Sequence, residues 1–106
     1  MSMQFDHVTI AKKANVYFGG KCISYNLDFP GHSSKTVGVI LPSSVTFSTD
    51  SPEIMEIVAG KCRVRIGEES DWKTYEGGQR FHVPGASSFD IEVLEPVHYV
   101  CHFVND

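Results

Sequence analysis

The chain has 106 residues, of which 42% are hydrophobic and 21% charged, and its formal net charge is -4. This length fits a single domain with one modest core, and the composition is too apolar for a disordered chain. The acidic residues are scattered and no basic cluster is evident, which disfavours a nucleic-acid partner, because phosphate neutralisation needs clustered Lys and Arg.

Residues 1–14 carry little pattern, and we expect them to form a polar lead-in to a domain that spans residues 15–106. From residue 16 onward, short β-like runs alternate with turn clusters rich in Gly and Pro, and no window keeps a helical period over three turns. We therefore predict strands over 16–18, 21–29, 37–41, 45–49, 54–59, 61–66, 72–75, 79–83, 88–94 and 97–104.

Many short strands at this spacing are typical of an all-β sandwich or barrel. Clear alternation in three of them assigns inward faces, which consist of Cys62, Val64 and Ile66, of Phe89, Ile91 and Val93, and of Tyr99, Cys101 and Phe103. The residues expected on outer faces are Lys61, Arg63, Arg65, His98 and His102. Each apolar face must be buried, and a sheet that closes on itself buries it without a helix layer.

Three widely spaced cysteines, Cys22, Cys62 and Cys101, fit neither a disulfide framework nor a zinc motif. Reduced thiols in the cytoplasm are the simpler interpretation. The first residues lack the basic start and apolar run of a secretory leader, and no apolar run is long enough to span a membrane. We therefore expect no membrane partner.

Two segments have the spacing of the paired motifs of cupin barrels. Six residues separate Glu53 from Gly60, and five residues separate Gly78 from Pro84-Gly85. The chain thus resembles the cupin family, and the resemblance implies a single-domain, jelly-roll-like β-barrel.

The same resemblance places the four metal-ligand positions of cupins on Thr46, Ser48, Glu53 and Phe89. Glu53 alone cannot hold a divalent transition metal, which needs about three protein ligands. We therefore expect a cupin that has no metal.

A closer resemblance extends over about residues 15–104, on the strings at 16–21, 37–39, 46–49, 52–53, 78–85 and 99–101. These strings resemble the short cupin pyrimidine/purine nucleoside phosphorylases. The resemblance implies a homodimeric, metal-independent pentosyltransferase without an organic cofactor. It would use inorganic phosphate as co-substrate to split purine and pyrimidine nucleosides into free base and (deoxy)ribose 1-phosphate.

In such a reaction phosphate is the nucleophile, so the protein must hold it near the sugar C1' and stabilise an oxocarbenium-like sugar. Glu53 is the candidate for the sugar charge, because its motif position points inward. Tyr99 is the candidate proton donor to the leaving base. Thr46 and Ser48 are expected to bind ribose hydroxyls or phosphate oxygens.

Lys35 lies in a polar stretch before a strand, and its ammonium group is the candidate hydrogen-bond donor to phosphate. Phe81 and Phe89 face inward with Tyr99 and are candidates to stack a base, whereas alternation turns Phe47 outward. Each candidate also has a plain structural interpretation: a turn carboxylate, satisfied core hydroxyls, a solvated lysine or core aromatic rings.

Two alternatives to the phosphorylase stay open. A non-catalytic small-molecule-binding cupin would explain the missing ligands and the lack of a crowded titratable cluster. A metal-dependent cupin oxygenase or isomerase is the other, and Thr46, Ser48 and Phe89 argue against it.

Overall fold

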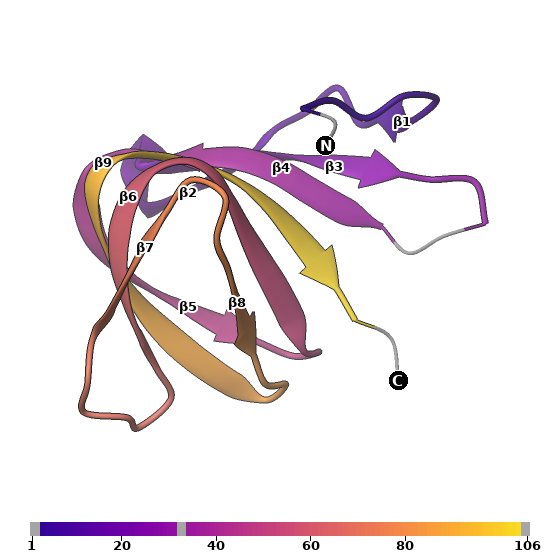
Figure 1. The fold of residues 1–106 in the computed structure, drawn as a ribbon. Coiled ribbons are helices and arrows are strands. Elements are labelled where there is room, and N and C mark those ends of the chain that lie inside the picture. The colour runs from indigo at the N-terminus through magenta and orange to yellow at the C-terminus, as the bar shows by residue number, and fades with distance from the viewer. Residues whose placement is uncertain (1–2, 32–33, 105–106) are drawn as a thin grey trace.

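The computed structural model describes residues 3–31 and 34–104, which form one antiparallel β-sheet (Figure 1). A short 3-10 turn, η1 (Phe18–Gly20), follows the second strand, and no α-helix occurs in the described part. The strands are β1 (Thr9–Ile10), β2 (Asn15–Tyr17), β3 (Cys22–Asp28), β4 (Lys35–Ile40), β5 (Ser43–Thr49), β6 (Glu53–Ile66), β7 (Lys73–Glu76), β8 (Arg80–Val83) and β9 (Ser87–Phe103). The prediction of an all-β chain is therefore confirmed.

Two long strands, β6 and β9, organise this sheet because they pair with each other along most of their length. The first part of β9 lies between β5 and the end of β6, and its last part lies between β4 and the start of β6. Strand β3 continues the sheet beyond β4, and β7 and β8 pair with different parts of β6. Because both long strands bend, the two parts of the sheet face each other across the core (Figure 1).

Closure into a barrel, as predicted, is not seen. The pairing order runs β1-β3-β4-β9-β6-β7, and no ladder among the described residues joins its two ends. The sheet instead buries its inner face by folding over, which leaves open edges.

The prediction of separate strands at 54–59 and 61–66, and again at 88–94 and 97–104, is wrong. Each pair is one continuous strand, with register shifts near Ala59 and Lys61 that mark a β-bulge. Gly60 has φ +98, and a Cβ added there would lie 2.1 Å from the Pro96 carbonyl oxygen. Glycine and proline therefore bend the paired strands here and do not end them.

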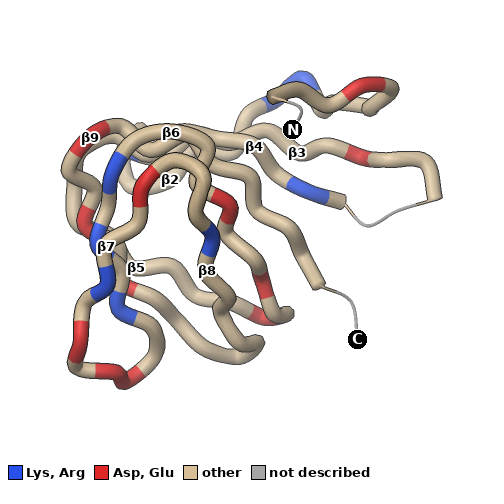
Figure 2. Tube along the Cα trace, in the orientation of Figure 1, with Lys and Arg blue, Asp and Glu red and all other residues tan. Residues whose placement is uncertain are grey.

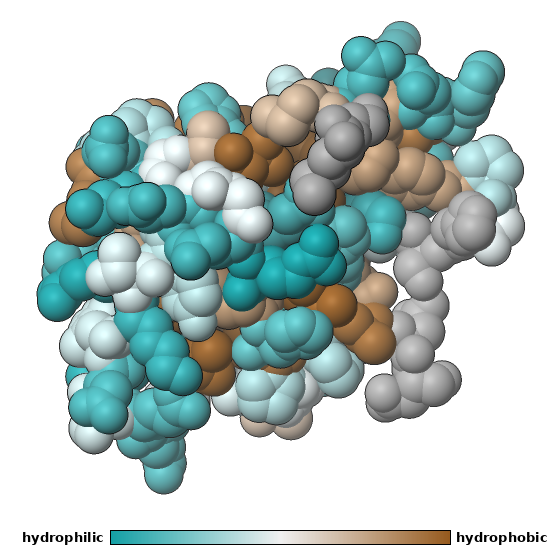
Figure 3. Space-filling model, in the orientation of Figure 1, coloured by the Kyte–Doolittle hydropathy of each residue, from teal (hydrophilic) through white to brown (hydrophobic). Residues whose placement is uncertain are grey.

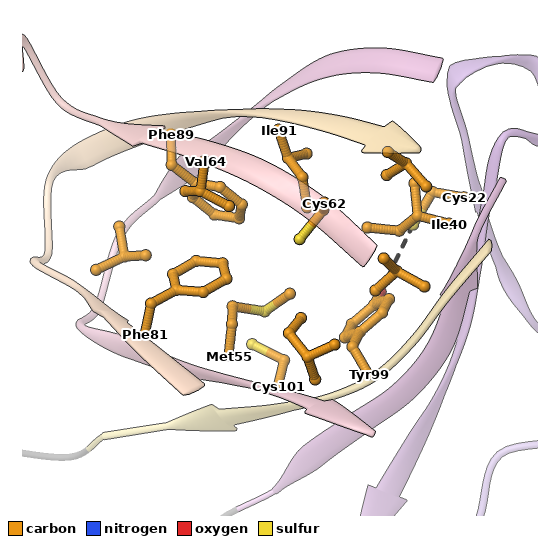
Figure 4. Packing of buried hydrophobic residues seen from close by; sticks show 14 residues of the cluster. Cys22, Ile40, Met55, Cys62, Val64, Phe81, Phe89, Ile91, Tyr99 and Cys101 are labelled. Carbon is orange, nitrogen blue, oxygen red and sulfur yellow. Dashed lines mark hydrogen bonds between the residues drawn. The ribbon is translucent and has the colours of Figure 1, made fainter. Parts of the chain in front are cut away.

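The inner faces predicted from alternation are confirmed except at Phe103, which is 37% exposed and lines a cavity without joining the core. Cys62, Val64, Phe89, Ile91 and Val93 are buried in a single core cluster, with Ile66 packed against it. Tyr99 and Cys101 belong to the same cluster, in which side chains from both parts of the sheet meet (Figure 4). Burial in this cluster raises the pKa of the Cys62 thiol to about 11, and all three cysteines are free.

The predicted outer row on β6 is also confirmed, and each of its arginines has an acidic partner on β9. Arg63 Nε lies 3.1 Å from Glu92 Oε1, and Arg65 Nη2 lies 2.9 Å from Asp90 Oδ2. Both guanidinium groups also contact the Trp72 ring, at 5.1 and 4.8 Å from its centroid. Basic and acidic residues thus alternate in space on this outer face (Figure 2), and no basic surface forms there.

Candidate functional site

A cavity of about 530 Å³ opens on the inner side of the sheet, within the size range of small-molecule sites. It lies between the turn after β2, the inner side of β5, the start of β6 and the last part of β9. The residues that line it are Tyr17, Phe18, Ser24, Thr36, Thr46, Phe47, Ser48, Asp50, Ser51, Glu53, Met55, Phe89, Tyr99, Cys101 and Phe103.

Glu53, the first residue of β6, places its carboxyl group in this cavity. Strand pairing sets Glu53 opposite Phe103, which is two residues from the inward Cys101 on β9. The Cys101 thiol donates a hydrogen bond to Glu53 Oε1 at 3.1 Å. Burial raises the pKa of Glu53, outweighing the lowering by this hydrogen bond, and nearby Asp50 raises it further.

This pKa shift predicts how stability depends on pH. Because the folded state holds the Glu53 proton more tightly than the unfolded state, the free energy of unfolding falls as pH rises from about 4.3 through the raised pKa. Glu53→Gln has no such proton. Urea unfolding of both proteins between about pH 4 and pH 8 is expected to show the wild type losing stability relative to the variant. A difference that grows in the opposite direction contradicts the assignment.

Tyr99 lines the cavity from β9 and is 7% exposed. Its hydroxyl lies 3.5 Å from the Cys22 sulfur (Figure 4). It also forms a hydrogen bond with Ser24, which like Cys22 belongs to β3. Burial raises the pKa of this phenol, so it stays neutral at physiological pH and keeps a proton to donate.

Aromatic rings form one wall of the cavity. Phe89 is buried, and Phe47 stacks on it with ring centroids 5.3 Å apart and an interplanar angle of 21°. The prediction that Phe47 faces outward is wrong, because Val45 and Phe47 are the β5 residues that pack against the core.

Consequently Thr46 and Ser48 border the cavity with exposed side chains and do not form its floor. The Thr46 hydroxyl donates to Asp90 Oδ1 at 2.6 Å. Because side chains alternate along a strand, Thr46 and Ser48 cannot both share the inner face with the intervening Phe47.

Lys35 lies away from the cavity, which does not fit the expected phosphate-binding role. Strand β4 begins at Lys35, two residues earlier than predicted, and alternation then turns Thr36 inward and Lys35 outward. Its ammonium group donates to His102 Nδ1 at 2.8 Å, and His102 Nε2 lies 2.8 Å from Glu56 Oε1. The expected placement of His102 on the outer face is confirmed, and Glu56 lies beside it there.

Phe81 faces inward as predicted but belongs to the core. It is 3% exposed, lies between Tyr75 and Phe89 at 4.9 and 5.6 Å between ring centroids, and does not line the cavity. The structure thus brings together Glu53, Phe89 and Tyr99, with Thr46 and Ser48 at the border.

Sequence reasoning missed several lining residues, including Phe18, Thr36 and Phe47. For Phe47 the cupin motif spacing favoured its two neighbours, whereas pairing of β5 with β9 sets Phe47 opposite the inward Phe89. Thr36 and Phe18 gave no such signal, because their placement depends on strand pairing and on a turn. No group of three His, Cys, Asp or Glu side chains suited to a metal ion occurs among the described residues.

Comparisons with known proteins agree with this fold and chain length. The fold is similar to that of oxalate decarboxylase from Bacillus subtilis, with a TM-score of 0.64 at 17% identity, over 86% of this chain and 28% of that one. A crystal structure of a protein of unknown function from Acinetobacter sp. ADP1 has a TM-score of 0.95 and 51% identity, over 97% of this chain and all of that one. The fold and its inner cavity therefore define a cupin-like β protein.

The family follows from sequence similarity. The family model for pyrimidine/purine nucleoside phosphorylase matches residues 12–103. A pyrimidine/purine nucleoside phosphorylase from Janthinobacterium sp. (strain Marseille) is 57% identical over 98% of this chain and 100% of its own length. The chain belongs to the pyrimidine/purine nucleoside phosphorylase family.

No helix in the described ranges is long and apolar enough to cross a membrane.

Proposed function

We propose that the protein catalyses phosphate-dependent cleavage of purine and pyrimidine nucleosides to free base and (deoxy)ribose 1-phosphate. The observation that carries the proposal is a half-buried carboxyl group, Glu53, inside a cavity walled by stacked phenyl rings. A carboxylate suits the positive charge that develops on the sugar, and aromatic rings suit a planar base.

In this proposal each group has one task. Ionised Glu53 stabilises the oxocarbenium-like sugar, while the Cys101 thiol fixes the direction of its carboxylate. The neutral Tyr99 phenol is the candidate donor to the leaving base. Phosphate attacks C1' as the base departs, so the C1'–N bond breaks as the C1'–O bond forms and the base leaves with the bonding electron pair.

We assign phosphate binding to the hydroxyl groups that line the cavity. Among the described residues that line the cavity, none is Lys, Arg or His, whereas hydroxyl side chains come from Ser24, Thr36, Thr46, Ser48 and Ser51. Hydroxyls and loop amides hold phosphate oxygens without a fixed positive charge. We expect a phosphate KM that is high compared with that of an arginine-based site.

A nucleoside scan with and without phosphate tests the function. We expect base release from both purine and pyrimidine nucleosides only when phosphate is present, with equal amounts of pentose 1-phosphate. The cupin metal-ligand positions hold Thr46, Ser48 and Phe89, so we expect activity to survive dialysis against chelator.

Absence of base release across both nucleoside classes would contradict the phosphorylase. Nucleosides that raise the melting temperature without turnover would favour the non-catalytic binding cupin. Stoichiometric bound metal, with activity lost on chelation, would favour a metal enzyme.

We also propose a homodimer in the cytoplasm. The free thiols suit a reducing compartment. An apolar groove of about 1070 Å³ lies over the outer side of β3, β4 and β9, and it includes Val37, Val39 and the partly exposed Ile23 and Tyr25. Apolar residues also reach the surface between hydrophilic ones on the face shown in Figure 3. Exposed apolar patches of this kind mark association surfaces.

The dimer predicts a mass of two chains in solution. Val39→Asp puts a charge in the groove, and light scattering is expected to show a shift to the mass of one chain. Leu94→Asp is the matched control, because Leu94 is 46% exposed and lies outside the groove. A one-chain mass for the wild type, or equal dissociation in both variants, contradicts this interface.

A further inference from the structure

The turn between β2 and β3 holds a large aromatic residue in left-handed backbone. Phe18 has φ 53, followed by Gly19 at φ 63 and Gly20 at φ 96. The Lys21 amide donates to the Phe18 carbonyl oxygen at 3.2 Å. Glycines adopt such a turn without strain, whereas a phenylalanine in this region is an outlier.

The Phe18 ring lies at the cavity and is only partly covered. It is 44% exposed and packs edge-on against Phe47, with centroids 5.2 Å apart at 90°. Phe47 in turn stacks on buried Phe89. The three rings form a row that leads from the exposed turn to the interior of the cavity, where Glu53 also lies.

Core packing alone accounts poorly for a phenylalanine at this position. Nearly half of the side chain stays in water, and its backbone is strained. Strain of this kind at a cavity is an indicator of function. An accessible ring that completes an aromatic wall beside a carboxyl group offers a stacking surface for a planar, uncharged ring.

We propose that Phe18 is the residue that binds the nucleobase: the base stacks on the Phe18 ring while the sugar extends toward Glu53. This inference rests on the proposed function and assigns the base-binding position within the same site. Stacking needs no particular hydrogen-bond donor or acceptor on the base, so it accommodates purines and pyrimidines alike. A purine has the larger ring surface and therefore depends on Phe18 more than a pyrimidine does.

Three substitutions separate the ring from the backbone strain. Phe18→Ala and Phe18→Gly both remove the ring, and Phe18→Tyr keeps it. Leu94→Ala is the control, because Leu94 is 46% exposed and lies outside both the cavity and the apolar groove. KM and kcat are measured for inosine and uridine at saturating phosphate, and KM for phosphate at saturating inosine.

We expect Phe18→Ala and Phe18→Gly to raise the inosine KM about tenfold and the uridine KM less, with kcat and phosphate KM within about twofold. Phe18→Tyr and Leu94→Ala are expected to keep the wild-type KM for both nucleosides. Because glycine relieves the left-handed strain, Phe18→Gly is expected to melt about 4 °C above Phe18→Ala despite the same KM.

Unchanged nucleoside KM values in Phe18→Ala overturn the inference while leaving the phosphorylase intact. So does an equal rise in phosphate KM, or the same rise in Leu94→Ala, since either indicates a general structural defect. If the wild type releases no base, the readout is thermal stabilisation by inosine. If inosine stabilises the wild type but not Phe18→Ala, the base-binding role of Phe18 is supported and the phosphorylase function is contradicted. If inosine stabilises neither protein, both proposals are contradicted.

Discussion

Glu53→Gln is expected to lower kcat for phosphorolysis by about a hundredfold or more, the effect of removing one preorganised charge from a transition state. Glutamine keeps the side-chain length and an oxygen that can still accept the Cys101 hydrogen bond. It removes only the negative charge, which acts on the sugar as the bond to the base breaks. Steady-state kinetics at saturating nucleoside and phosphate measure the loss, and KM is expected to change little.

Glu56→Gln is the matched control for this experiment. Glu56 lies on the same strand but on the outer face, where its carboxylate contacts His102 at 2.8 Å. The same change of charge there is expected to leave kcat within about twofold, because an outer-face charge is screened by solvent. Retained activity in Glu53→Gln removes the catalytic assignment while leaving the function intact. Equal losses in both variants indicate a general perturbation.

Gly60→Ala is expected to lower the free energy of unfolding by about 3 kcal/mol or more. Two costs add at this position: a backbone φ of +98, and a Cβ that would lie 2.1 Å from the Pro96 carbonyl oxygen. The contact is with backbone in the bend between β6 and β9, so the long strands must separate to accommodate it. Urea unfolding of the two proteins measures the difference.

Gly78→Ala separates these two costs. Gly78 has φ +93, but nothing lies within 4 Å of an added Cβ. Only the conformational cost remains there, and we expect a loss of about 1 kcal/mol. Equal losses of stability in the two alanine variants would show that the close approach of Gly60 to Pro96 adds no steric cost to the conformational one.

Alternation predicted the inner faces of β6 and β9 because a period of two reports burial directly. The Cys62, Val64 and Phe89 positions are examples, as are the outer Arg63 and Arg65. The ends of the strands were harder to predict than their inner faces. Gly60 and Pro96 look like ends of strands in sequence, but pairing across the bend keeps both strands continuous.

The candidate site was predictable in part. Glu53, Phe89 and Tyr99 line the cavity as expected. Lys35 and Phe81 do not: β4 begins two residues earlier than predicted and alternation within it turns Lys35 outward, while neighbouring rings enclose Phe81 in the core. Each of these outcomes depends on partners far away in the chain.

From the sequence alone, local alternation and turn spacing predicted an all-β chain, and the resemblance of short strings to the nucleoside phosphorylase family placed Glu53 at a position where cupins bind metal. Local patterns are sufficient for both, because each depends on short runs of neighbouring residues. Only the tertiary structure decided that Phe47 rather than Thr46 packs against the core, that Lys35 pairs with His102 and that the Phe18 ring joins the wall. Register between distant strands and the backbone of one turn fix those positions, and short-range patterns do not encode either.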